Sequence, residues 1–290
     1  MPDPISLVTA ITGIPGIFKS CVDCFQYVRL GQRFGKDYGI CLAKLEAAHI
    51  RLTRWGEPLG LLQDKVKVQG SFSDEDIIRA YELLALIEAT FEEAQEAAAK
   101  YADSRRKKGK DKDLELIDEE HMGLGGSIKL LVTSLKSVSK ERQRNLSLPR
   151  KITWALYGKD GFDSLIGDIV ALTSNLMELF PSNERRMKEL CQEEVNNLDD
   201  ECVFELGRVL QNDDKMLPNT DDAMMSETIR VHVESHRLQF RNVNIDGQGI
   251  TRLGDTYGYG SGVKPSDVSI DGMTIRGSGY TQAGHVFHGK

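Results

Sequence analysis

The chain has 290 residues and a formal net charge of −7, with 40% hydrophobic and 28% charged residues. These values are typical of a soluble globular protein, and the acidic balance argues against a general nucleic-acid-binding surface. The length allows one large domain or two smaller ones. Five cysteines, and an apolar N-terminus with Asp3 where a secretory signal needs a basic residue, indicate a reducing, cytoplasmic compartment.

The first predicted element is an apolar helix over residues 4–30. Its hydrophobic residues recur at helical spacing, and Gly13-Ile14-Pro15-Gly16 predicts a kink that divides the helix into two pieces. The uncharged run 4–18 has 15 residues, fewer than the about 20 that a membrane-spanning helix requires. We expect residues 5–25 to pack on other helices in the soluble state, because an exposed apolar patch of that size promotes aggregation.

Further helices are predicted through the middle of the chain, and no strand is predicted before Phe240. A cap at Ser73, followed by acidic residues, opens a helix that passes Lys100. The other segments with helical character are 37–55, 118–144, a short helix from Pro149 through Leu156, 162–180, 183–211 and 221–235. These helices, about seven or eight in number, predict an all-α bundle.

The C-terminal tail is rich in glycine and contains a short sequence written twice. The two copies are Asn242-Val243-Asn244-Ile245-Asp246-Gly247 and Asp267-Val268-Ser269-Ile270-Asp271-Gly272. Their similarity predicts a repeat with an offset of 25 residues. Apolar and polar residues alternate in both copies, as in strands with one buried face, and the glycines suit bends. The predicted repeat core consists of Val243, Ile245, Gly247, Ile250, Gly254, Val268, Ile270, Gly272, Ile275 and Gly279.

Two such copies cannot bury their own apolar faces, since repeat proteins need about three neighbouring units to form a core. We therefore expect the tail to be disordered in the monomer and to form a β-solenoid or cross-β stack when several molecules assemble. The alternative is a tail that stays disordered, which the eleven glycines of residues 240–290 favour. Against it stand the lack of glutamate after Glu234 and the single proline, Pro265.

No catalytic, metal-binding or nucleotide-binding constellation is recognised in the sequence, so we expect no enzyme activity and no cofactor. Cys21 and Cys24 form a C-x-x-C without a second ligand pair, which favours buried packing. His232 and His236 lie one turn apart on a predicted helix, and the glutamate between them is displaced by one residue from the zinc-protease motif. The pair has the spacing to share a metal, but a solvent-exposed helix face is the favoured interpretation.

Four stretches of the sequence resemble the HeLo domain of the fungal HET-s/LopB family, and the likeness reaches about residue 220. They are Ser20-Cys21-Val22-Asp23-Cys24-Phe25-Gln26-Tyr27-Val28-Arg29-Leu30-Gly31, Phe34-Gly35-Lys36-Asp37-Tyr38, Arg51-Leu52-Thr53-Arg54-Trp55-Gly56-Glu57 and Lys151-Ile152-Thr153-Trp154-Ala155-Leu156-Tyr157. The resemblance implies a helical domain from heterokaryon incompatibility, a non-self recognition that ends in cell death.

The resemblance also implies a mechanism. In the family, a C-terminal motif with two imperfect repeats folds as an amyloid β-solenoid, and the helical domain then opens and inserts its apolar N-terminal segment into the plasma membrane. The implied partners are further copies of the chain, a nucleotide-binding receptor with a similar repeat, and membrane lipid. The matching membrane-active residues here are Ile5, Leu7, Val8, Ile11, Ile14, Ile17, Phe18, Val22 and Phe25.

The expected organisation has three parts: a HeLo-like helical domain over 1–220, a last helix and linker over 221–236, and a two-repeat prion-forming tail over 237–290. The main hypothesis is a cell-death protein switched by amyloid templating. The rival is a non-toxic prion-type or adaptor variant whose helical domain mediates protein–protein interaction only. Templating of the tail is expected to compete with the weak last helix, whose β-branched Thr228, Val231 and Val233 lower its helix propensity.

Overall fold

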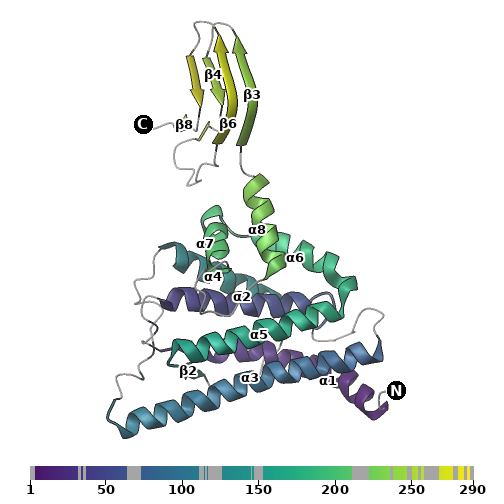
Figure 1. Cartoon of the computed structure of the whole chain (residues 1–290). Coiled ribbons are helices and arrows are strands. Elements are labelled where there is room, and N and C mark those ends of the chain that lie inside the picture. Colours follow the sequence, from purple (N-terminus) through teal and green to yellow (C-terminus); the bar gives the residue numbers. More distant parts are fainter. Residues whose placement is uncertain are drawn as a thin grey trace. The chain divides into compact units, whose positions relative to one another are not determined.

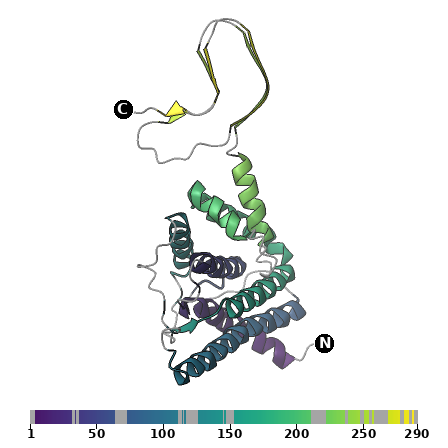
Figure 2. The same cartoon turned by 60° about the vertical axis from the view of Figure 1, so that its left-hand side comes forward.

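A computed structural model of the chain divides into two compact units, Met1–Ser226 and Glu227–Lys290 (Figures 1 and 2). The structure describes residues 4–31, 34, 37–63, 73–110, 114, 116, 126–144, 146, 153–210, 222–235, 238–246, 250–253, 256–257, 268–276, 280–283 and 286–287.

The first unit is a bundle of α-helices, which confirms the predicted fold class. In chain order these are α1 (Pro4–Tyr27), α2 (Tyr38–Gly56), α3 (Asp74–Lys107), α4 (Gly126–Arg142), α5 (Lys159–Leu179), α6 (Glu184–Asn196) and α7 (Asp200–Leu210). The long helix α3 packs along both α1 and α5, and α2 packs on α4 and α5 (Figure 1). Helix α8 (Ala223–Ser235) contains the boundary between the two units.

The start of α3 follows from local chemistry, as predicted. The hydroxyl of Ser73 accepts a hydrogen bond from the backbone N–H of Asp76 at 3.1 Å. Acidic residues fill the first turn and basic residues fill the last, an arrangement that complements the helix dipole. One stripe of the helix, including Leu84, Ile87 and Phe91, is buried.

The core is centred on Trp55 at the end of α2. Its indole N–H donates to the carbonyl oxygen of Leu176 at 2.9 Å. The rings of Phe18 and Phe180 each lie 5.9 Å from the Trp55 ring, so α1, α2 and the end of α5 meet at this side chain. Since Trp55 is buried with its one polar atom bonded, the site satisfies both packing and hydrogen bonding.

A small parallel strand pair corrects two predictions. Strand β1 (Val28–Leu30) pairs with β2 (Trp154–Leu156), with Val28 opposite Trp154 and Leu30 opposite Leu156. The expected short helix from Pro149 through Leu156 is therefore wrong for its described part, as is the expectation of no strand before Phe240. In β1 both flanking apolar residues are buried and Arg29 is exposed, the alternation of a half-buried strand.

Helix boundaries also differ from the sequence-based ones. Helix α1 is a single helix that contains Pro15, so its predicted division into two pieces is wrong. The stretch 183–211 is two helices rather than one, because α6 ends at Asn196 and α7 begins at Asp200. Asp199 caps the second helix by accepting a hydrogen bond from the N–H of Cys202 at 2.7 Å, and such a cap is what starts a new helix.

In the described part of the second unit, six strands form three parallel pairs. Strand β3 (Leu238–Asp246) pairs with β6 (Val268–Arg276), β4 (Ile250–Leu253) with β7 (Tyr280–Ala283), and β5 (Thr256–Tyr257) with β8 (Val286–Phe287) (Figure 1). Each pair joins a strand of the first repeat to the corresponding strand of the second. The two repeats are thus two layers of one arrangement, each with three strands among its described residues.

Candidate functional site

The apolar face of α1 is buried along its second half and exposed near its start. Ile14, Phe18, Val22 and Phe25 are all buried, whereas Val8 is 61% exposed. Ile11 is also exposed, Leu7 and Ile17 are half-buried, and the side chain of Ile5 lies outside the described residues. The expectation that this segment packs on other helices therefore holds from Ile14 onward and is wrong for Val8 and Ile11.

Helix α1 also has the length and composition to cross a membrane. The stretch Leu7–Tyr27 has 21 residues and contains an 18-residue window with a mean hydropathy of 1.3, of which 39% is buried within the protein. The core helix of a soluble protein meets the same criterion, so length and hydropathy do not by themselves assign a membrane role. The uncharged run 4–18 is shorter than a membrane span, but the apolar helix extends beyond residue 18 and reaches the required length.

A buried ion network joins α2, α6 and the start of α8. The guanidinium of Arg54 donates to Glu194 at 2.6 and 3.1 Å and to Asp222 at 2.6 Å. All three side chains are almost completely buried. Glu194 also receives a hydrogen bond from Arg142 of α4. The network therefore connects four helices through buried charged groups.

Asp222 has two functions in this network. Its second carboxylate oxygen accepts the backbone N–H of Met225 at 3.2 Å, which caps the first turn of α8. Burial alone would raise the pKa of Asp222, but the guanidinium of Arg54, with a smaller effect from Arg51, holds that pKa below its ordinary value of 3.8. The side chain is thus a charged cap fixed to the body by an ion pair.

Sequence reasoning did not identify this network. Arg54 stands between Thr53 and the core residue Trp55, but adjacent residues of a helix do not share a face, so its position in the sequence does not reveal that the cation is buried. Its partners are separated from it by 140 and 168 positions, and no local pattern reveals them.

The strand register corrects the predicted repeat. Leu238 pairs with Val268, Phe240 with Ile270 and Ile245 with Ile275, so the offset is 30 residues and the predicted offset of 25 is wrong. The same offset continues in the shorter strands, where Ile250 pairs with Tyr280.

Physical complementarity explains the register. An offset of 30 sets apolar residues opposite apolar ones along the whole of β3 and β6, and it sets Arg241 opposite Asp271 and Asp246 opposite Arg276. Opposite charges and apolar residues at paired positions stabilise neighbouring strands, and like charges destabilise them. The offset of 25 matches only a local motif.

Six of the ten predicted repeat-core residues lie in this register. Val243, Ile245 and Ile250 are in the first repeat and Val268, Ile270 and Ile275 in the second, opposite partners other than those predicted. Gly272 lies within β6 rather than at its end. Gly247, Gly254 and Gly279 lie outside the described residues.

The side chains considered for chemistry are placed for packing. Cys21 is fully buried and its thiol donates to the carbonyl oxygen of Leu84 at 3.2 Å, while Cys24 is half-buried. His232 lies on α8, and His236 is outside the described residues. Within the part of the chain that the structure describes, no group of three or more His, Cys, Asp or Glu side chains is arranged to hold a metal ion.

Comparison with known proteins identifies relatives of both units. The family model HeLo, described as prion-inhibition and propagation, matches residues 6–206. The heterokaryon incompatibility protein S of Podospora anserina is 30% identical over 205 residues, which cover 70% of this chain and 68% of that protein. The heterokaryon incompatibility protein s of Podospora anserina is 26% identical over 301 residues, which cover 100% of this chain and 98% of that protein.

Solved structures agree with these matches. The structure of the HET-S N-terminal domain superposes with a TM-score of 0.65 at 26% identity, covering 77% of this chain and 94% of that domain. A mutant of the HET-s N-terminal domain superposes with a TM-score of 0.63, covering 76% of this chain and 98% of that domain. Since the matched residues and the helical fold agree, this chain belongs to the HeLo family of prion-inhibition and propagation proteins.

Proposed function

We propose that this chain is a cell-death protein of the heterokaryon-incompatibility type, switched by amyloid templating of its two repeats. The observation that carries the proposal is the parallel, 30-residue register of the three strand pairs. In such an arrangement the second repeat continues the first, and a further copy of the chain continues the second in the same way.

The strand edges support stacking between molecules. Among the described residues each pair is a two-stranded sheet, so every strand has one edge without a partner strand. Such an edge exposes a row of backbone donors and acceptors that a strand from another molecule satisfies. Alternating Arg241 and Asp271 through a stack would keep opposite charges adjacent across each molecular boundary.

In this proposal the switch acts on the helical unit and its first helix. Templated assembly of the repeats would displace the short helix α8, open the body and release α1 for insertion into the plasma membrane. The partly exposed apolar start of α1 and its 21-residue apolar length support this role. The protein would be cytoplasmic until activated, and its partners would be further copies of itself, a receptor carrying a similar repeat, and membrane lipid.

Fibre formation by residues 236–290 tests the templating step. We expect fibres with a cross-β spacing of about 4.7 Å. Replacing both Ile245 and Ile275 by Pro should prevent assembly, because proline removes a backbone donor and fixes φ. Replacing the same two residues by Val is the matched control and should leave assembly intact. Normal fibres from the proline variant would contradict the proposal.

Leakage of dye from liposomes tests the second step. Full-length protein seeded with tail fibres should release dye, and the same protein with a disulfide fixing α8 to the body should assemble without release. Equal leakage from both would refute the coupling between the two units. Fibre formation without any leakage from the unconstrained protein would instead favour the adaptor or non-toxic prion-type variant.

A further inference from the structure

A cluster of positive charge lies at the C-terminal end of α3. The six residues from Arg105 to Lys110 carry five basic side chains and no acidic one, in a chain whose net charge is −7. Over the longer stretch 105–113 the sequence contains six basic and two acidic residues, so the excess of positive charge persists. Residues 106–110 are all exposed, and Figures 1 and 2 show this end of α3 at an extremity of the helical unit.

The turn that carries the cluster has a fixed backbone. The N–H of Gly109 donates to the carbonyl oxygen of Arg106 at 3.0 Å, and the N–H of Lys110 donates to that of Arg105 at 3.0 Å. These two bonds, with Gly109 in the left-handed conformation at a φ of 63°, form a Schellman motif. The lysines on both sides of Gly109 are therefore held in position at the end of the helix.

The helix dipole accounts for only part of the cluster. It favours cations in the last turn of α3, where residues 105–107 are all basic. Lys108 and Lys110 lie beyond that turn and extend the cluster past the end of the helix. Within the part of the chain that the structure describes, Lys107, Lys108 and Lys110 form no ion pair. Their charges are therefore available to a partner outside the protein.

Aromatic side chains lie beside the cluster. Arg105 donates to the hydroxyl of Tyr101 at 2.9 Å and lies 5.0 Å from the centroid of its ring, and that ring stacks on Tyr157 at 5.8 Å. Trp154 and Arg106 line the same surface hollow of about 230 Å³. Trp and Tyr side chains concentrate at the boundary between water and lipid, because each has an apolar ring and a polar group. The combination of cations and aromatic rings is therefore typical of a surface that contacts lipid headgroups.

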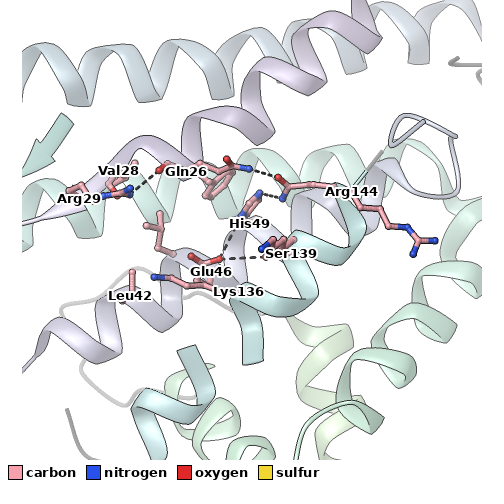
Figure 3. Close-up of a pocket in the computed structure, with 13 residues that line it drawn as sticks. Gln26, Val28, Arg29, Leu42, Glu46, His49, Lys136, Ser139 and Arg144 are labelled. Carbon is pink, nitrogen blue, oxygen red and sulfur yellow. Dashed lines mark hydrogen bonds and ion pairs between the residues drawn. The ribbon is translucent and has the colours of Figure 1, made fainter. Parts of the chain in front are cut away.

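A second basic group of the helical unit has its contacts within the protein. It lines a pocket of about 430 Å³ between α1, α2 and α4 (Figure 3). There Arg29 donates to the carbonyl oxygens of Gln26 and Val28 at 2.9 and 3.0 Å. Arg144 pairs with Glu141 at 2.6 Å. The lysines at the end of α3 differ from these arginines, since no such contact holds them among the described residues.

We propose that the basic end of α3 docks on the surface of an anionic lipid bilayer. Clusters of about four to eight Lys and Arg side chains are attracted to such surfaces, and each cation near the surface strengthens the binding by about fivefold. A bilayer fits this site because it touches only the end of the helix. An extended polyanion such as RNA would also meet the acidic body of the protein, which repels it.

The direction of α1 separates this contact from insertion of α1. Gly13 of α1 lies against Tyr81 of α3. Ser20, further along α1, is hydrogen-bonded to Glu88, so the two helices run in the same direction. Lys107 lies 26 residues after Tyr81, which is about 39 Å along the helix at about 1.5 Å per residue. Docking therefore takes place at the opposite end of α3 from the exposed start of α1, and it requires neither release of α1 nor assembly of the tail.

Co-sedimentation of the unseeded full-length chain with vesicles tests the proposal. We expect binding to phosphatidylcholine vesicles that contain phosphatidylserine and no binding to phosphatidylcholine alone. Added salt should weaken the binding, because it screens exposed charges. The combined variant Lys107→Gln, Lys108→Gln and Lys110→Gln should bind about a hundredfold more weakly, since each of the three lysines contributes about fivefold.

The matched control combines Lys129→Gln, Lys140→Gln and Lys188→Gln. These exposed lysines lie on α4 and α6, and their loss changes the net charge of the chain by the same amount. The control should bind as the original protein does, and so should a variant with arginine at positions 107, 108 and 110, because arginine keeps the charge. Equal losses in the two glutamine variants, a loss in the arginine variant, or equal binding to phosphatidylcholine alone would each overturn the proposal.

The fluorescence of Trp154 reports the docked contact directly. The chain has two tryptophans, and Trp55 is buried in the core. With anionic vesicles the emission should therefore shift to shorter wavelength, and the shift should be absent in Trp154→Phe. An unchanged emission, or tighter binding of a polyuridine RNA than of the vesicles, would contradict docking on a bilayer. Docking is measured without seeding and without dye release, so its failure is separable from failure of the proposed templating function.

Discussion

Replacement of Asp222 by Asn should release α8 from the helical body. The asparagine side chain still accepts the N–H of Met225, because Asn caps helices about as well as Asp. What the substitution removes is the negative charge opposite Arg54, while Arg54 keeps its two bonds to Glu194. The change therefore isolates one buried ion pair from the cap that shares its carboxylate.

The expected cost follows from the geometry. A buried hydrogen bond between charged groups contributes about 1.5–3 kcal/mol, so we expect α8 to open more easily by about 2 kcal/mol. This corresponds to about a thirtyfold loss of protection from hydrogen exchange in α8. Hydrogen exchange of full-length protein at pH 7, followed by mass spectrometry of peptides covering Ala223–Ser235, measures it directly.

Asp199→Asn provides the matched control. Asp199 caps α7 through the N–H of Cys202, but it is exposed and pairs with no guanidinium among the described residues. Its replacement should leave exchange in α7 within a few-fold of the original, since surface changes typically alter stability by less than about 0.5 kcal/mol. Unchanged protection in Asp222→Asn, or equal losses in both variants, would refute the assigned role of the ion pair.

The ion pair between Arg54 and Asp222 should also make the free energy of opening of α8 depend on pH. Because Arg54 keeps the pKa of Asp222 below 3.8, the folded state favours the ionised carboxylate. The resulting stabilisation is complete above the unfolded-state pKa and is lost as the pH falls through the folded-state pKa. The difference between the original protein and Asp222→Asn should therefore be constant from about pH 5 to 7 and shrink below about pH 4. A difference that shrinks as the pH rises would contradict this assignment.

Two further substitution and labelling experiments test the packing of the helical unit. Gly56→Ala should lower the free energy of unfolding by about 1–3 kcal/mol, because the new Cβ would lie 2.5 Å from Cε2 of Phe18. The control, Gly16→Ala in α1, places its Cβ where no atom lies within 4 Å and should raise the free energy of unfolding by about 0.5–1 kcal/mol. A Gly56→Ala protein as stable as the original would contradict the close contact. Burial raises the pKa of the Cys41 thiol to about 12, so iodoacetamide at pH 8 should label half-buried Cys24 first and Cys41 only after unfolding. Peptide mass spectrometry measures both rates, and equal rates in the folded protein would refute the difference.

The features that the sequence determined by itself are those with local causes. The cap at Ser73 and the acidic residues that follow it start α3, because a side chain three residues away satisfies a backbone N–H. The apolar stripe of α1 follows from spacing within one helix. The alternation of apolar and polar residues identified β3 and β6 as strands for the same reason.

Tertiary structure alone decided how distant segments combine. Strand β2 was predicted as part of a short helix, because its three residues become a strand only by pairing with β1 across more than a hundred positions. Arg54 shows no partner in its own neighbourhood, since Glu194 and Asp222 come from later helices. A buried charge needs such partners to offset its lost hydration, and the fold brings them together.

The repeat register belongs between these two cases. The short match around Ile245 and Ile270 suggested an offset of 25 residues, but pairing selects the offset that makes the whole length of two strands complementary. Because successive side chains of a strand alternate between faces, register is an energetic property of the full ladder and not of its best-matching segment. The sequence therefore specified that two repeats exist. Their alignment, in which Ile245 pairs with Ile275, is set by complementarity along the full length of β3 and β6.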